Sequence, residues 1–197
     1  MTITPLALAF ILLGLAVLAG LIVTLTRRRH SHLLRSRYGP EYDEAVRRTG
    51  NAREAEHLLE RREKRVSQFT IVPLSDARRT EYVTRWRDIQ AQFVDDPAGA
   101  LARADVLLGE VMNERGYPVT DFDQRSADLS VDHPEVVQNY RAGHDIAVRH
   151  ARGESDTEDL RQAMIHYRAL FDDLVNEPPM AADTHRTAPL GKERIRD

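Results

Sequence analysis

The sequence predicts an all-α protein: one N-terminal transmembrane helix, then a cytoplasmic domain of about five to six helices with no sheet. Three observations predict this class. Residues Leu6 to Leu25 form an uninterrupted apolar run. From Tyr38 onward, apolar residues recur at the three- and four-residue spacing of a helix. No segment alternates apolar and polar residues as a half-buried strand does.

The apolar run has the length of a membrane span. Its 20 residues carry no charge, and 13 of them are Leu, Ile, Val or Phe. At a helical rise of about 1.5 Å per residue the run reaches roughly 30 Å, the thickness of a bilayer's hydrocarbon core. A cleaved signal peptide is the alternative, but it requires a positively charged start and a shorter apolar stretch. We therefore expect residues 6–25 to span a membrane.

The charges beside this run predict its orientation. Arg27, Arg28 and Arg29 follow it directly, whereas residues 1–5 carry no charged side chain. Arginines next to a span are retained on the cytoplasmic side. The sequence thus predicts a single-pass protein of the cell membrane with residues 1–5 outside. A basic juxtamembrane segment over residues 26–37 and the rest of the chain would then be cytoplasmic.

Capping residues and apolar periodicity predict the helices of residues 38–176. The first helical region, Tyr38 to Phe69, is expected to break at Thr49 and Gly50. Its second part has a narrow apolar face, typical of a projecting or coiled-coil helix. The expected starts are Asn51, Ser75, Asp96 before Pro97, Asp132 before Pro134, and Asp156 or Thr157.

Apolar side chains on these helices predict the core. Tyr82, Trp86, Ile89 and Phe93 share one stripe, and the last helix carries the cleanest amphipathic pattern in the chain. Residues 117–132 are expected to form a loop with one short helix. The proline pair and polar composition of residues 177–197 predict a disordered tail.

Composition excludes some chemistry and reveals a charge asymmetry. The chain has no cysteine, which excludes disulfides and thiol nucleophiles. Arg27–Arg87 holds 16 basic and 9 acidic residues, whereas Asp88–Glu177 holds 8 basic and 19 acidic residues. The basic half suits an anionic membrane surface, and simple solvation of the helix faces explains the asymmetry equally well.

Two segments carry a resemblance. Gly116 to Arg141, GYPVTDFDQRSADLSVDHPEVVQNYR, and Asp159 to Val175, DLRQAMIHYRALFDDLV, resemble an uncharacterised family of bacterial single-pass membrane-anchored helical proteins. The resemblance covers Tyr38 to Val175. It implies the same plan of an anchor followed by helices, and it carries over no activity, substrate or catalytic residue.

Aspartates and histidines cluster between residues 121 and 150. Carboxylates and imidazoles together could bind a divalent metal or carry out acid–base chemistry. The cluster lacks a His-Glu-x-x-His pair, and its aspartates suit helix starts and turns, while His144 suits a partly buried core position. The candidate metal ligands are Asp121, Asp123, Asp132, His133 and His144.

These observations favour a membrane-tethered interaction or scaffold module over an enzyme. Neither a glycine-rich phosphate loop nor a nucleophile elbow is present, so we expect no catalytic residue, cofactor or small-molecule substrate. Arginines alternate with glutamates between Arg47 and Arg65, which argues against nucleic acid as a partner. A protein partner at the acidic half or a homo-oligomer is expected. The alternative is a metal-binding or metal-dependent hydrolytic domain that uses the Asp- and His-rich residues 121–150.

Overall fold

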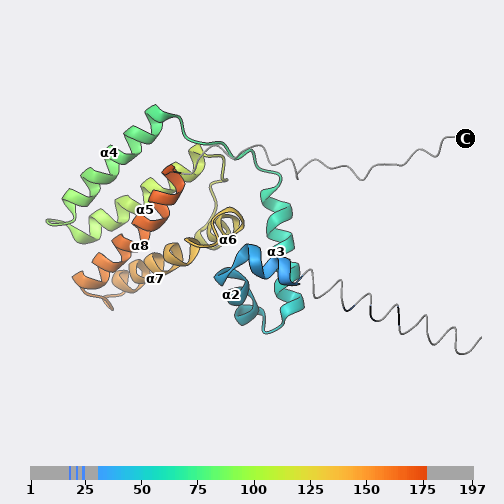
Figure 1. Cartoon of the computed structure of the whole chain (residues 1–197). Helices are drawn as coiled ribbons and strands as arrows, with labels where there is room; N and C mark the ends of the chain where they lie inside the picture. Colours follow the sequence, from blue (N-terminus) through green and yellow to red (C-terminus); the bar gives the residue numbers. More distant parts are fainter. Residues whose placement is uncertain (1–17, 19–20, 22–23, 25–30, 177–197) are drawn as a thin grey trace, which may run out of the picture.

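The computed structural model describes residues 18, 21, 24 and 31–176, shown in colour in Figure 1. All regular structure in these residues is helical, which confirms the all-α class for this part of the chain. Residues 31–38 are helical, and seven labelled helices follow, one more than the upper expectation. They are α2 (Pro40–Thr49), α3 (Ala52–Val66), α4 (Asp76–Gln92), α5 (Pro97–Glu114), α6 (Phe122–Asp132), α7 (Val137–Ala151) and α8 (Thr157–Asn176).

Four helices, α4, α5, α7 and α8, form the larger part of the molecule (Figure 1). Helix α8 is central, because it packs against α7, α5 and the edge of α4. Its apolar stripe is buried, and Phe171 stacks on Trp86 of α4 with ring centroids 4.5 Å apart. The predicted aromatic stripe of α4 is confirmed as core, with Tyr82, Trp86 and Ile89 buried.

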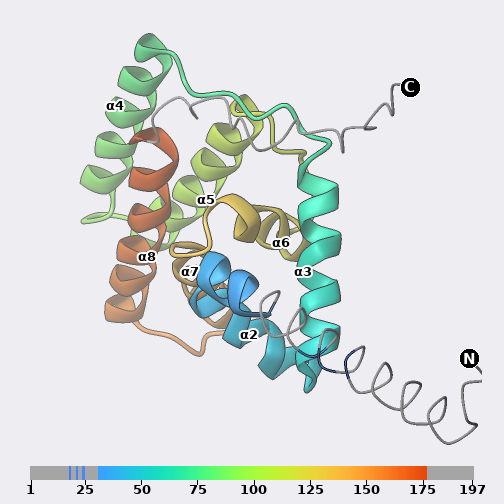
Figure 2. The same cartoon turned by 45° about the vertical axis from the view of Figure 1, so that its right-hand side comes forward.

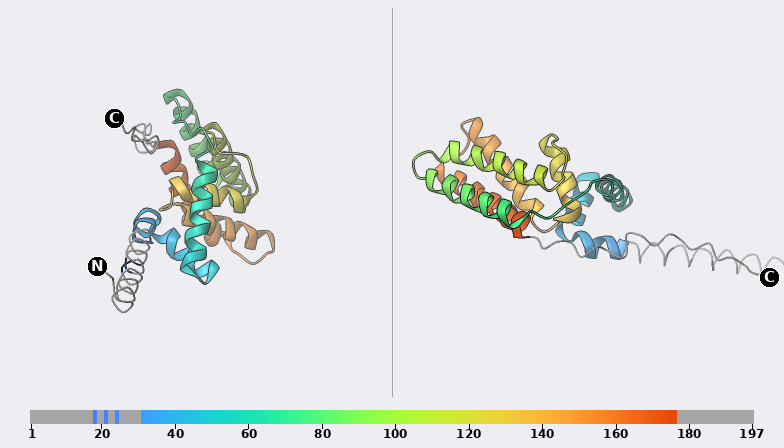
Figure 3. Two further views of the ribbon diagram at one scale, coloured as in Figure 1. Left: turned by 90° about the vertical axis from the view of Figure 1, so that its right-hand side faces the viewer. Right: turned by 90° about the horizontal axis from the view of Figure 1, so that it is seen from above.

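Helices α2 and α3 form a hairpin beside this bundle (Figures 2 and 3). The hairpin has its own small core, in which Tyr38 and Leu59 are fully buried. Helix α6 lies between the hairpin and the bundle and contacts both α3 and α7. The expectation that α3 projects as a coiled-coil helix is therefore wrong, because α2 and α6 cover its narrow apolar face.

Short polar side chains begin several of the helices. Asn51, Ser75 and Asp96 each accept a hydrogen bond from a backbone N–H in the first turn of α3, α4 and α5, as predicted. A Cβ atom at Gly99 would overlap the Asp96 carboxylate, so glycine leaves room for this cap. The predicted cap at Asp132 is wrong, because Asp132 ends α6 and α7 begins at Val137.

The predicted single-pass membrane topology requires correction. Among the residues that the structure describes, no helix combines the length and the apolar character that crossing a membrane demands. The reason is that these helices carry charged faces: even α5 includes Arg103, Asp105 and Glu110. The predicted span at residues 6–25 lies outside the described residues except for Leu18, Leu21 and Thr24. The predicted localisation in the cell membrane depended on a spanning helix, and the described residues provide none. The predicted tail at residues 177–197 also lies outside the described part.

Candidate functional site

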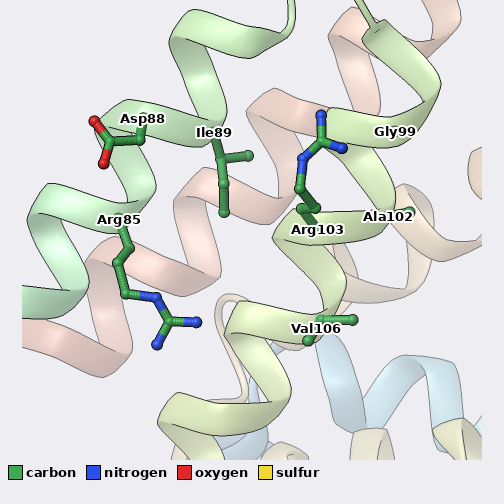
Figure 4. A pocket seen from close by; sticks show the side chains of 7 residues that line it. All are labelled: Arg85, Asp88, Ile89, Gly99, Ala102, Arg103 and Val106. Atoms are coloured by element: carbon green, nitrogen blue, oxygen red, sulfur yellow. The ribbon is translucent and has the colours of Figure 1, made fainter.

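Several surface hollows lie along α5, and one of them is a groove between α4 and α5 (Figure 4). Its volume is about 500 Å³. We call it the α4/α5 groove. Ile89 of α4 and Arg103 of α5 face one another across it, whereas Asp88 turns outward. The lining residues are Arg85, Asp88, Ile89, Gly99, Ala102, Arg103 and Val106.

The two arginines of the α4/α5 groove are already neutralised. Arg85 pairs with Glu110 of α5 at 2.6 Å, and this contact raises the pKa of its guanidinium above the usual value. Arg103 pairs with Asp96 at 3.2 Å. Asp88 forms no ion pair with any described residue. The groove thus offers an apolar floor and one acidic side chain without a counter-ion.

The second hollow lies on the other side of α5, between α5, α7 and α8, and its volume is about 470 Å³. We call it the α5/α7/α8 pocket. Its walls are mostly apolar, with Leu101, Val148 and Leu160 among them. Ala102 and Val106 line both this pocket and the α4/α5 groove, so α5 separates the two hollows.

Four polar side chains line the α5/α7/α8 pocket: Asp105, His144, His150 and Tyr167. His150 contacts the Ser155 hydroxyl at 3.1 Å. The His144 ring stacks on Phe122, with centroids 3.5 Å apart. Burial raises the pKa of the Tyr167 hydroxyl, and the nearby Asp105 charge raises it further. Tyr140 beside them has a raised pKa for the same two reasons. Both hydroxyls therefore stay protonated well above neutral pH.

A buried ionic cluster joins the α2–α3 hairpin to the bundle. Glu41, only 1% exposed, accepts hydrogen bonds from Arg62 at 2.6 Å and from both terminal nitrogens of Arg141 at 2.6 and 3.0 Å. Gln138 donates to the same carboxylate, and Arg62 also donates to Ser130. We call this the Glu41 cluster. Because its hydrogen bonds run between α2, α3 and α7, the cluster holds two parts of the fold together.

The structure disperses the five predicted metal ligands. Asp121 caps α6, and Asp123 is exposed. Asp132 accepts a hydrogen bond from Tyr117, and His133 pairs with Asp173. His144 lies apart from these, stacked on Phe122 in the α5/α7/α8 pocket.

No group of three or more His, Asp or Glu side chains within the described part of the chain is arranged to hold a metal ion. The physical reason is that four of the five predicted ligands already serve a cap, a hydrogen bond, an ion pair or a ring contact. The orienting arginines Arg27, Arg28 and Arg29 lie outside the described residues.

Sequence reasoning did not single out Asp105, Tyr167 or Glu41 as polar groups of interest. For Asp105 a signal exists, since it lies four residues after Leu101 and three before Leu108, which places a carboxylate beside the buried stripe of α5. Tyr167 belongs to the amphipathic last helix, whose apolar stripe was expected to contribute to the core, and it is fully buried. Glu41 offers no signal, because its partner Arg141 lies 100 residues away.

Comparison of the chain with known proteins assigns it to no family. The chain matches no family model, no curated protein and no solved structure. The family resemblance inferred from the sequence stays a prediction. The described residues define an all-α domain with two adjoining surface hollows along α5.

Proposed function

We propose that this protein is a helical protein-interaction module, and that the α4/α5 groove binds an amphipathic, basic helix of a partner protein. The observation that carries the proposal is the exposed apolar face of α5 along the groove. Val106, at one end of the groove, is 61% exposed. Small residues at positions 99 and 102 allow a helix to approach closely, because the distance between packed helices depends on the side chains at the contact.

Charge supports a basic partner. Residues 76–114, which include α4 and α5, contain 8 acidic and 5 basic residues, so the two helices that border the groove carry excess negative charge. Complementary charge accelerates encounter and suppresses wrong partners. The same excess disfavours a second copy of the chain, since two acidic bundles would face one another. The two groove arginines offer little repulsion to a basic helix, because each is paired with a carboxylate.

The test measures binding of a synthetic amphipathic peptide of leucine and lysine to the full-length protein by fluorescence anisotropy. The control for charge is a peptide in which glutamate replaces every lysine and the leucines keep their positions. We expect the lysine peptide to bind and Val106→Arg to weaken it at least tenfold. Val94→Arg is the matched variant, because Val94 is 84% exposed and lies outside the groove. It should change affinity by less than twofold.

Several results would contradict the proposal. Equal affinity for the two peptides would remove the argument from charge. Equal weakening by both arginine variants would remove the groove as the binding surface. Sedimentation that finds a dimer broken by Val106→Arg alone would replace the basic partner with a second copy of the chain.

A further inference from the structure

We propose that the α5/α7/α8 pocket is a binding site for a small organic amine, a ligand with an apolar body and one ammonium group. This inference goes beyond the proposed function, because it concerns a separate pocket on the other side of α5. It rests on two buried polar atoms that have no hydrogen-bond partner of good geometry: Oδ1 of Asp105 and Oη of Tyr167. Both residues line the pocket.

Buried polar atoms without partners are rare in native proteins, because each one loses its hydrogen bonds to water and gains nothing in return. Tyr167 is fully buried, and Asp105 is partly buried. The Asp105 carboxylate lies close enough to raise the pKa of the Tyr167 hydroxyl through its charge and a side-chain contact, but no hydrogen bond of good geometry joins Asp105 Oδ1 to Tyr167 Oη. An acceptor and a hydroxyl thus remain open in one apolar pocket.

The surrounding structure holds the Tyr167 ring in place. Gly143 of α7 lies directly against it: a Cβ atom there would come within 2.6 Å of two ring carbons. The Tyr140 ring packs on another side, with centroids 5.9 Å apart. Because both neighbours belong to packed helices, Tyr167 cannot turn its hydroxyl away to solvent. The open hydroxyl is therefore a fixed feature of the pocket.

Arg125, which lines a neighbouring hollow together with Asp105, is engaged elsewhere. Arg125 donates hydrogen bonds to the Tyr140 hydroxyl at 3.0 Å and to the backbone oxygen of Thr120 at 3.2 Å. Asp105 forms no ion pair with any residue that the structure describes. A negative charge on the wall of an apolar pocket thus lacks a protein counter-ion, which a ligand can supply.

These groups select the ligand by charge and by shape. An ammonium group can donate hydrogen bonds to Asp105 Oδ1 and to Tyr167 Oη at once, and its positive charge balances the carboxylate. A carboxylate ligand would meet the negative charge of Asp105 and is disfavoured. Leu101, Val148 and Leu160 favour an apolar body, and a volume of about 470 Å³ accommodates an aromatic ring.

The experiment compares three probes that differ only in their polar group: benzylamine, benzyl alcohol and benzoate. Binding to the full-length protein is measured by isothermal titration calorimetry at neutral pH. We expect benzylamine to bind most tightly and benzoate at least tenfold more weakly. Asp105→Asn should weaken benzylamine at least tenfold, whereas Asp95→Asn, which removes an exposed carboxylate that lines neither hollow, should leave its affinity unchanged.

Tyr167→Phe keeps the test valid if Asp105→Asn fails to fold, because it removes only the buried hydroxyl and retains the ring. This variant should bind benzylamine at least threefold more weakly. Benzoate binding as tightly as benzylamine would overturn the proposal, and so would wild-type affinity in both pocket variants. Either failure leaves the peptide experiment on the α4/α5 groove unaffected.

Discussion

Glu41 shows how one buried side chain determines the packing of distant helices. Its carboxylate meets two guanidinium groups, one from α3 and one from α7, and it is shielded from solvent. Breaking a buried ion pair by removing one partner leaves the remaining charge without compensation. In this cluster, removal of the carboxylate would leave the buried Arg62 and the half-buried Arg141 without their shared counter-ion.

We therefore predict that Glu41→Ala destabilises the protein by about 3–5 kcal/mol. Asp43→Ala is the matched variant, since Asp43 pairs with Arg35 at the surface, where such a pair contributes only about 0–1 kcal/mol. The free energy of unfolding in urea, followed by circular dichroism, measures both. A loss below about 1 kcal/mol for Glu41→Ala would mean that the cluster does not stabilise the fold.

At the scale of the elements, glycine sets the path of the chain where α5 ends. Gly116 adopts a φ of 99°, and a Cβ atom there would lie 2.2 Å from the backbone oxygen of Thr70. The segment between α3 and α4 thus passes directly over the end of α5, and Val72 donates a backbone hydrogen bond to Arg115. A side chain at position 116 would push these two segments apart.

We predict that Gly116→Ala is much more destabilising than Gly153→Ala. Both glycines have positive φ, which costs a residue with a side chain about 1–2 kcal/mol, but a Cβ atom at Gly153 meets no atom within 4 Å. Gly116→Ala adds a clash with backbone and should at least double that loss. Thermal unfolding of the two variants provides the comparison, and equal midpoints would show that the close approach at Thr70 is not maintained in solution.

The elements also show what the sequence can and cannot predict. The starts at Asn51, Ser75 and Asp96 depend on contacts within one turn, so local sequence is enough to find them. The prediction that Asp132 caps the next helix was wrong. Asp132 instead ends α6, and its carboxylate accepts a hydrogen bond from Tyr117, which precedes that helix. Long-range contacts of this kind cannot be inferred from spacing.

The candidate site was less predictable than the helices. His144 was correctly singled out as a ring on a partly covered helix face, although its stacking partner Phe122 was not foreseen. The polar base of the α5/α7/α8 pocket unites Asp105 of α5 with Tyr167 of α8. Only the packing of α5 against α8 brings them together, and helical periodicity within either segment cannot predict that packing.

At the scale of the whole molecule, buried tyrosines connect folding to alkaline pH. Burial is the first cause that raises the pKa of Tyr38, Tyr140 and Tyr167 above the ordinary value of 10.0. The folded state therefore holds these protons more tightly than the unfolded state does. The associated stability is fully present below pH 10.0 and is lost as the pH rises above that value towards the pKa values of the folded state.

We predict that the free energy of unfolding falls steeply above pH 10.0 and that Tyr167→Phe makes this fall shallower. Absorbance at the wavelength of tyrosinate should rise in two stages, the exposed hydroxyls first and the buried ones together with loss of helical circular dichroism. A single stage centred near the ordinary tyrosine pKa, with helix content retained, would contradict this interpretation.

The Glu41 cluster has a consequence for the order in which the nascent chain assembles. Glu41 and Arg62 leave the ribosome together, but the second arginine of the cluster lies 100 residues after Glu41. Until α7 has been synthesised, the N-terminal hairpin lacks both the helix it docks on and the charge that completes its carboxylate contact. The α2–α3 hairpin is therefore synthesised well before it can reach its final position, and translation of α7 completes its packing.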